Sequence, residues 1–256
     1  MTALSVRLSG KVYASRTPGC DHKALGSLEF SIPEGQLTCI LGPSGCGKTT
    51  LLNIMSGLDP DMEGTVRVGD GAPDGHAIGY MFQTPRLLDW LSVIDNIRLV
   101  MDKEAIRSGR AERLLKQMRL EDVMDAFPNR LSGGMQRRVA LARAFAVNPG
   151  VLLMDEPFIS LDAPVANRLR HLLLEIWSAR PTTILFVTHD LHEALYLADR
   201  VLFMSSSPGR IVLDLAVDLR RPRDPNDPAI DELAHSLLRE HPKLLAGLAK
   251  GSSEEA

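Results

Sequence analysis

The sequence predicts an α/β fold with a largely parallel sheet, because apolar runs of strand length alternate with helical patterns. The runs contain no charged residue, which is typical of strands buried on both faces; they are Leu37–Leu41, Val151–Met154 and Thr183–Val187. A helix is expected to begin at Lys48 and to end at Gly57. Another is expected after Asp162, a common N-cap residue, with Pro164 in its first turn.

The composition is that of a globular protein. The 256 residues are 45% hydrophobic, and their formal charge of −3 argues against broad, non-specific binding to nucleic acid. No apolar run reaches the roughly 18–20 residues that cross a bilayer, and residues 1–13 lack a secretory hydrophobic segment, so we expect a cytosolic protein. The cysteines, Cys20, Cys39 and Cys46, match no zinc-binding spacing, and we expect structural roles for them.

Residues 84–147 break the alternation and predict a helical insertion in the α/β core. One apolar stripe is formed by Ala111, Leu114, Leu115 and Met118. Basic residues flank this stripe: Arg107, Arg110, Arg113, Lys116 and Arg119. We interpret these charges as a solvated helix face, with an anion-binding site as the alternative.

The end of the chain predicts a hairpin followed by an appended helix. Arg200–Met204 and Arg210–Leu215 flank a turn of serines, proline and glycine, which favours an antiparallel pair of strands. Residues 220–228 are charged and broken by prolines, so we interpret them as a linker to a last helix over 231–248. The chain is thus expected to divide into a domain at 1–219, with its helical subdomain at about 84–147, and an appended segment at 220–256.

The most informative motif follows the first buried strand. Residues 42–49 match G-x-x-x-x-G-K-[ST] between a predicted strand and a predicted helix, which is the context that this phosphate-binding motif requires. Its glycines let backbone N–H groups converge on phosphate oxygens, and the helix amino terminus adds partial positive charge. Lys48 is expected to reach the β- and γ-phosphates of ATP, and the Thr49 hydroxyl to ligate Mg²⁺. The expected nucleotide-binding set is Gly42, Pro43, Ser44, Gly45, Cys46, Gly47, Lys48, Thr49 and Thr50.

An acidic pair, Asp155 and Glu156, follows the apolar run at 151–154. An acid at the carboxyl end of a parallel strand faces the crevice in which ligands bind. Asp155 is expected to hold Mg²⁺, directly or through water, and Glu156 to polarise the attacking water as a general base. A solvated turn is the alternative for this pair taken alone.

A second glycine-containing segment begins at Ser132. Ser132, Gly133 and Gly134 lead into a helix expected near Met135, where free backbone donors suit a phosphate group. Ser-Gly-Gly is also a common helix entry. This pattern alone therefore leaves both interpretations open.

Taken in order, these motifs resemble those of an ABC-transporter ATP-binding subunit. The order is the phosphate loop, Gln83, the signature at 131–135, Asp155-Glu156, residues 160–162 and His189, and it spans about residues 4–214. The resemblance implies a P-loop NTPase (RecA-like) core with an antiparallel β subdomain and an inserted α-helical subdomain. It also implies a head-to-tail homodimer, with ATP bound between the phosphate loop of one copy and the signature of the other.

The resemblance also implies roles for residues that are ambiguous by themselves. Gln83 would contact Mg²⁺ or water, His189 the γ-phosphate, and Tyr13 would stack on adenine. The residues implied to face the partner chain and its ATP are Ser132, Gly133, Gly134 and Asp162. Without the ordered set, Gln83 is an ordinary strand-end residue and His189 a structural histidine. A packing role remains the alternative for Tyr13.

A narrower resemblance concerns the transported solute. Residues 82–91 (FQTPRLLDWL) and 207–211 (SPGRI) are similar to segments of the nitrate, sulfonate and taurine importer group, which also includes importers of pyrimidine thiamine precursors. This resemblance implies a subunit at the cytoplasmic face of the inner (plasma) membrane. It would power a separate permease, served by an extracytoplasmic solute-binding protein. The groove for the permease would be lined by Arg86, Leu87, Leu88 and Trp90, with packing inside the helical subdomain as the alternative for these side chains.

Two other functions compete with this interpretation. A soluble ABC ATPase of DNA repair or translation would need a coiled-coil insertion or tandem cassettes, and the sequence shows neither. A catalytically silent cassette is disfavoured because the reactive residues are all present: Lys48, Asp155, Glu156 and His189. The signature does depart from the family, since Met135 replaces the commonest glutamine and residues 136–138 are Gln-Arg-Arg rather than Arg-Gln-Arg.

Overall fold

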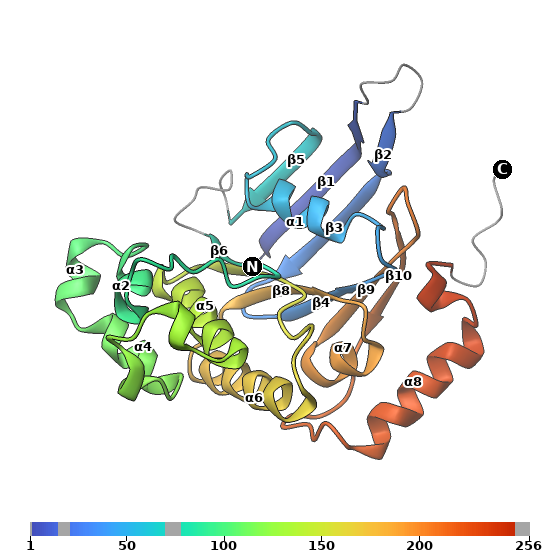
Figure 1. The fold of residues 1–256 in the computed structure, drawn as a ribbon. Helices are drawn as coiled ribbons and strands as arrows, with labels where there is room; N and C mark the ends of the chain where they lie inside the picture. Colours follow the sequence, from blue (N-terminus) through green and yellow to red (C-terminus); the bar gives the residue numbers. More distant parts are fainter. Residues whose placement is uncertain (1, 15–20, 70–77, 249–256) are drawn as a thin grey trace.

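The computed structural model describes residues 2–14, 21–69 and 78–248, so Cys20 lies outside the described residues. The strands are β1 (Thr2–Tyr13), β2 (His22–Leu25), β3 (Leu28–Pro33), β4 (Leu37–Leu41), β5 (Glu63–Val68), β6 (Ile78–Met81), β7 (Val151–Asp155), β8 (Thr183–Thr188), β9 (Arg200–Met204) and β10 (Ile211–Ala216). The helices are α1 (Lys48–Met55), α2 (Val93–Arg98), α3 (Lys103–Arg107), α4 (Arg110–Gln117), α5 (Gly133–Ala146), α6 (Ala163–Ala179), α7 (Leu191–Leu197) and α8 (Pro228–Glu240). Figure 1 shows their arrangement.

The centre of the molecule is a six-stranded sheet in the order β10-β9-β4-β8-β7-β6. All of its neighbouring strands are parallel except β10, which pairs antiparallel with β9. The inner strands β4 and β8 are buried along their whole length and carry no charged residue, because both faces of the sheet are covered there. In β7, Val151 and Leu153 pack toward α1, whereas Leu152 and Met154 pack toward α5 and α6. The predicted buried parallel strands and the predicted hairpin are confirmed.

A second, antiparallel sheet covers the α1 side of the central sheet. Its long strand β1 pairs with β2, β3 and β5. Leu4, Phe30 and Ile32 of this sheet share a core with Leu51 and Leu52 of α1. Helix α1 thus lies between the two sheets (Figure 1), as the expected antiparallel β subdomain requires.

The helical subdomain contains α2, α3, α4 and α5 and lies at one end of the central sheet (Figure 1). The predicted apolar stripe of α4 is buried. Asn96 of α2 is fully buried, and its side chain binds the backbone of the loop that follows β6. Its Oδ1 accepts from the Leu88 N–H at 2.8 Å, and its Nδ2 donates to the carbonyls of Leu88 and Leu91 at 3.1 Å each. Asn96 therefore fixes the shape of this loop.

The last helix is shorter than expected and begins earlier. Asp227 accepts a hydrogen bond from the Ala229 N–H at 2.9 Å, which caps α8 with Pro228 in its first turn. The helix ends at Glu240 because Pro242 restricts the backbone of His241 before it. A short 3₁₀ helix, Leu244–Ala246, follows. The expectation of one helix over 231–248 was wrong at both ends.

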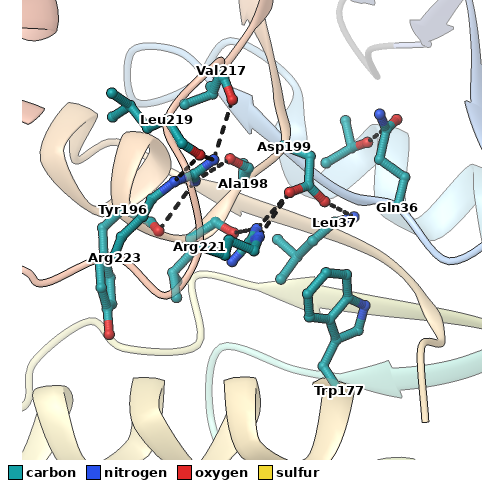
Figure 2. Close-up of polar contacts among 12 residues, drawn as sticks. Gln36, Leu37, Trp177, Tyr196, Ala198, Asp199, Val217, Leu219, Arg221 and Arg223 are labelled. Atoms are coloured by element: carbon teal, nitrogen blue, oxygen red, sulfur yellow. Dashed lines mark hydrogen bonds and ion pairs between the residues drawn. The ribbon is translucent and has the colours of Figure 1, made fainter. Parts of the chain in front are cut away.

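Residues 220–227, here called the C-terminal strap, are anchored to the domain rather than extended as a free linker. The guanidinium of Arg223 is buried and donates to a ring of backbone carbonyls. Figure 2 shows those of Tyr196, Ala198, Val217 and Leu219, and the carbonyl of Leu195 completes the ring. Burial and the neighbouring Arg221 lower the pKa of Arg223 to about 10, so it stays protonated at neutral pH. Arg221 pairs with Asp199 at 2.7 Å and lies over the ring of Trp177. The strap thereby caps the carboxyl end of α7.

We predict that Arg223→Met destabilises the protein by roughly 2–4 kcal/mol, because several buried carbonyls lose their donor at once. Equilibrium denaturation in urea measures the loss. The matched control is Arg220→Met in the same strap, where the side chain is exposed and a change within about 0.5 kcal/mol is expected. Equal midpoints for the two variants would show that the carbonyl ring contributes nothing.

Candidate nucleotide-binding and catalytic site

The phosphate loop connects β4 to α1, as predicted. Gly47 has φ +98°, and a Cβ there would lie 2.7 Å from Leu25 Cδ2 and 2.9 Å from the Ala24 carbonyl oxygen. Glycine is therefore required at this position by both conformation and space. No side chain caps the amino end of α1, so its first-turn N–H groups remain available to an anion.

Lys48 is the buried cation of this loop. Its side chain is 6% exposed, and Nζ donates to the carbonyls of Gly42 at 2.7 Å and Pro43 at 3.0 Å. Nζ also lies 4.0 Å from Glu156 Oε1. Cys46 is buried beside it, and burial raises the pKa of its thiol, so the sulfur is a packing group as expected.

The acidic pair lies at the carboxyl end of β7. Asp155 is buried, and its Oδ1 accepts from Thr49 Oγ1 at 3.3 Å. Burial raises the pKa of the Asp155 carboxyl, and the Thr49 hydrogen bond opposes that shift. A hydroxyl and a carboxylate side by side are hard oxygen donors, which suit Mg²⁺.

Parallel pairing of β7 with β8 brings the next residues together. Asp155 is in register with Val187, so Glu156 and His189 lie at the same edge of the sheet. The Glu156 N–H donates to the Val187 carbonyl at 3.1 Å, and its Oε2 lies 3.6 Å from His189 Nδ1. The Glu156 side chain is 16% exposed and lies between the Lys48 ammonium and the imidazole.

Lys48, Thr49, Glu156 and His189 open into one cavity of about 570 Å³, a volume that suits a small-molecule ligand. Asp155 lies buried behind Thr49 and does not itself line this cavity. The predicted site residues that line it are Tyr13, Ser44, Gly45, Gly47, Lys48, Thr49, Thr50, Gln83, Glu156 and His189. His22, Ala24 and Ile159 also line it and were missed by sequence reasoning. His22 and Ala24 belong to β2, a strand whose pairing with β1 carries no local sequence motif.

Tyr13 lies at the mouth of this cavity with 40% of its surface exposed. Its hydroxyl donates to Asp59 Oδ2 at 2.8 Å, and the ammonium of Lys11 lies 4.8 Å from its ring centroid. Lys11 is itself paired with Asp59 at 2.8 Å. These contacts hold the ring in one orientation while leaving part of its surface open.

The signature residues and Asp162 do not line this cavity. Ser132 caps α5 by accepting from the Met135 N–H at 3.3 Å. A Cβ on Gly134 would lie 2.5 Å from Val165 Cγ1, so this glycine permits the contact of α5 with α6. A Cβ on Gly133 would meet no described atom within 4 Å. Packing therefore explains Gly134 but not Gly133, which is exposed.

Two arginines outside the cavity, Arg137 and Arg170, hold the segments that carry Glu156 and His189, and the sequence alone did not predict this role. Arg137 of α5 is 8% exposed and donates to the carbonyls of Pro157 at 2.9 Å and Ile159 at 2.7 Å. It holds the loop after Glu156, a residue whose φ of +43° is costly for a non-glycine. Arg170 of α6 donates to Glu193 Oε1 at 2.9 and 2.6 Å.

Glu193 in turn connects Arg170 to the end of β8. Its Oε2 accepts from Thr188 Oγ1 at 2.6 Å, directly before His189 in the chain. Glu193 is 6% exposed, and burial raises its pKa, while Thr188 and Arg170 counteract the shift. This buried network fixes the backbone from which His189 projects.

The fold and this cavity define a P-loop ATPase. Residues 25–159 match the ABC transporter family. SsuB 2 of Burkholderia lata, an aliphatic sulfonates import ATP-binding protein, is 43% identical over 237 residues, covering 92% of this chain and 85% of that protein. SsuB 1 of Pseudomonas syringae pv. syringae, of the same description, is 41% identical over 237 residues, covering 93% of this chain and 95% of that protein.

A solved structure agrees with the sequence relatives. The dimeric, post-hydrolysis state of the ATP-binding cassette MJ0796, bound to ADP and Pi, matches with a TM-score of 0.74 and 30% identity. The match covers 85% of this chain and 100% of that one. The chain belongs to the ABC transporter family, as an ATP-binding and ATP-hydrolysing subunit of the importer class. Within the described residues, none of the helices has the length and apolar character needed to span a bilayer.

We predict that Arg170→Met destabilises the protein by about 2 kcal/mol or more at pH 8, because Glu193 is left buried without its cation. Without Arg170 the folded-state pKa of Glu193 rises further. A carboxyl whose pKa is higher in the folded than in the unfolded state lowers the free energy of unfolding when it is ionised. This destabilisation is at its full size above the folded-state pKa and vanishes below the unfolded-state pKa. The loss should therefore shrink between pH 8 and pH 5.

Chemical denaturation at both pH values measures this effect. Arg168→Met, an exposed arginine of the same helix, is the matched control and should change little. Adding Glu193→Gln to Arg170→Met should recover part of the stability at pH 8. A pH-independent loss, with no recovery in the double variant, would refute the charge argument.

Proposed function

We propose that this subunit powers the uptake of an aliphatic sulfonate, or a close small organic anion, through a separate permease. The observation that carries the ATP-driven part is the convergence of the phosphate loop, Glu156 and His189 on one nucleotide-sized cavity. The solute class rests on relatives at 41–43% identity that are aliphatic sulfonates import proteins. The nitrate and taurine alternatives belong to the same group of importers.

The phosphate end of the cavity suits ATP. Lys48 and the free N–H groups of α1 would hold the β- and γ-phosphates, because both present positive charge to the cavity. No side chain caps these N–H groups, and the Glu156 carboxylate lies 4.0 Å from Lys48 Nζ, beyond hydrogen-bond distance. Thr49, Asp155 and Gln83 supply hydroxyl, carboxylate and amide oxygens, a donor set that fits Mg²⁺. When bound, Mg²⁺ neutralises charge that develops on the phosphate oxygens. At the other end, the open part of the Tyr13 ring suits stacking on adenine.

Glu156 is the group that we propose to orient and deprotonate the attacking water. Its carboxylate is close to both Lys48 and His189, so it is held between two groups that face the γ-phosphate position. A positioned general base contributes about 10²–10⁴ in rate. His189, 55% exposed in its side chain, remains free to contact the γ-phosphate.

The exposed signature supports action across a homodimer. Ser132 and Gly133 are exposed and lie outside the chain's own cavity, and Gly133 has space for a ligand beside it. We propose that they, with Gly134, hold the γ-phosphate of ATP bound to a second copy, with Asp162 at the seam. The related cassette MJ0796 is dimeric in its ADP- and Pi-bound structure.

The permease would bind the helical subdomain. Trp90 is 73% exposed on the loop that Asn96 holds in shape, close in sequence to Leu88, which is half-buried. A preformed loop with an exposed tryptophan is the kind of anchor that dominates protein interfaces. Docking there would place the subunit at the cytoplasmic face of the inner membrane, with the permease served by an extracytoplasmic solute-binding protein. A role in DNA repair or translation is not favoured by the import proteins among the relatives.

We predict that Glu156→Gln retains ATP binding and lowers the hydrolysis rate at least about 10²-fold, because only the general base is removed. Lys48→Ala should instead weaken nucleotide binding. Phosphate release and nucleotide titration separate the two effects.

Light scattering should show that Glu156→Gln with ATP forms dimers and that adding Ser132→Arg prevents them. Near-parental hydrolysis by Glu156→Gln, or a dimer insensitive to Ser132→Arg, would contradict the proposal.

A second prediction concerns the permease. Trp90→Asp should leave hydrolysis by the isolated subunit unchanged, yet weaken co-purification with the permease by about 2 kcal/mol or more. Leu58→Asp is the matched control, since Leu58 is 59% exposed on the core and lies outside the helical subdomain. If Trp90→Asp still co-purified with the permease, this docking assignment would be wrong.

The purified complex of the subunit with its permease and solute-binding protein also tests the solute. ATP hydrolysis that is stimulated by nitrate but not by ethanesulfonate would exclude sulfonate uptake.

A further inference from the structure

A second cavity, of about 290 Å³, lies away from the nucleotide site. It is bounded by α4, by the carboxyl ends of α5 and α6, and by the residues that lead into β7 and β8. It therefore opens at the amino edge of the central sheet, whereas the phosphate loop lies at the carboxyl edge. Helix α4 belongs to the helical subdomain and α6 to the core (Figure 1). Since residues of both helices line it, the cavity lies at their junction.

Three arginines from two segments of the chain converge on this cavity. Arg110 and Arg113 come from α4, and Arg180 follows α6. Within the described residues, no aspartate or glutamate lines the cavity, and none of these arginines forms an ion pair. Burial lowers the pKa of Arg110 most, the neighbouring Arg180 and Arg113 lower it further, and Asp102 opposes the shift.

The hydrogen bonds of these arginines go to neutral acceptors. Arg110 donates to the Phe145 carbonyl and to Asn148 Oδ1, each at 3.1 Å, and Arg180 donates to the same Asn148 oxygen. Arg113 donates to the Ser108 carbonyl at 2.5 Å. The bond to Phe145 caps the last turn of α5, which explains one contact of one arginine. It does not explain why two further guanidinium groups lie beside it.

The rest of the lining is largely apolar. Leu114 and Phe145 are buried and expose only 7% and 6% of their surface, and Ile176 adds a half-buried side chain from α6. Guanidinium groups bind the planar edge or paired oxygens of an oxyanion through charge-assisted hydrogen bonds. A lining that joins such groups to an apolar wall suits a ligand with both parts.

We propose that this cavity binds a small organic oxyanion, with a sulfonate or phosphate head on a short apolar chain. The head pairs with Arg110 and Arg180, and the chain packs on Leu114 and Ile176. Such a ligand supplies an anionic group inside the cavity, where no carboxylate of the described residues lines the wall. It also ties α4 of the helical subdomain to the end of α6 in the core. The basic residues that flank the apolar stripe of α4 thus divide into a solvated set and a cavity-lining pair, Arg110 and Arg113.

Isothermal titration calorimetry of ethanesulfonate into the full chain tests the proposal. The chain is first saturated with Mg²⁺ and ADP, so that the phosphate loop is occupied, and the salt concentration is kept low and constant. We expect saturable binding of one ethanesulfonate and none of ethylammonium. Arg180→Gln and Arg110→Gln should each weaken binding about tenfold or more, since each removes a charge-assisted contact. Arg107→Gln, an exposed arginine outside the cavity, should bind as the parent does.

Arg180 is exposed and lies beyond the last turn of α6, so its variant is expected to fold even if Arg110→Gln disturbs the cap of α5. Absence of saturable binding, or equal losses in Arg107→Gln and Arg180→Gln, would overturn the site. Titrations with inorganic sulfate and phosphate test whether the apolar part of the ligand contributes to binding. If either binds as tightly as ethanesulfonate, the apolar wall plays no part and the organic ligand is refuted.

Discussion

The function of this molecule depends on the parallel pairing of β4, β8 and β7. Because these strands run in one direction and in a fixed register, the phosphate loop, His189 and the Asp155-Glu156 pair all emerge at one edge. The residues are separated by more than a hundred positions in the chain, yet Lys48 and Glu156 approach to 4.0 Å. A slip of one residue in this register would turn Asp155 away from Thr49. The register of the backbone pairing therefore determines which side chains meet at this edge of the sheet.

The sequence could predict this part of the fold because its signals are local. Apolar strands, the helix after Lys48 and the glycine loop each depend on residues within a few positions of one another. The ends of α8 differ from the expected ones because Asp227 and Pro242 define them. An apolar pattern of helical spacing shows that a helix exists but does not show where it begins and ends. The anchoring of the strap is not predictable from the sequence, because nothing in residues 220–227 reveals which carbonyls Arg223 meets in the fold.

The roles of the supporting arginines, Arg137 and Arg170, could not be predicted for the same reason. Arg137 and Arg170 lie on helices where a charged residue normally indicates a solvated face. Here each meets a partner from a distant segment, the Pro157 and Ile159 carbonyls or the Glu193 carboxylate. Arg137 falls in the part of the signature whose order departs from the usual one, so a sequence signal existed. Its meaning required the position of the loop after Glu156, which only the fold provides.

Helix α7 shows how these supports combine around the histidine. At its amino end, Glu193 binds Thr188 and Arg170, and at its carboxyl end Arg223 binds the carbonyls of Leu195 and Tyr196. The helix has only 7 residues, too few to be stable by itself, so it owes its position to these contacts and to the core. His189 lies directly before Asp190, the N-cap residue of α7. The position of this imidazole beside Glu156 therefore depends on the C-terminal strap as well as on β8. The strap thus connects the C-terminal segment to the edge of the sheet at which Glu156 lies.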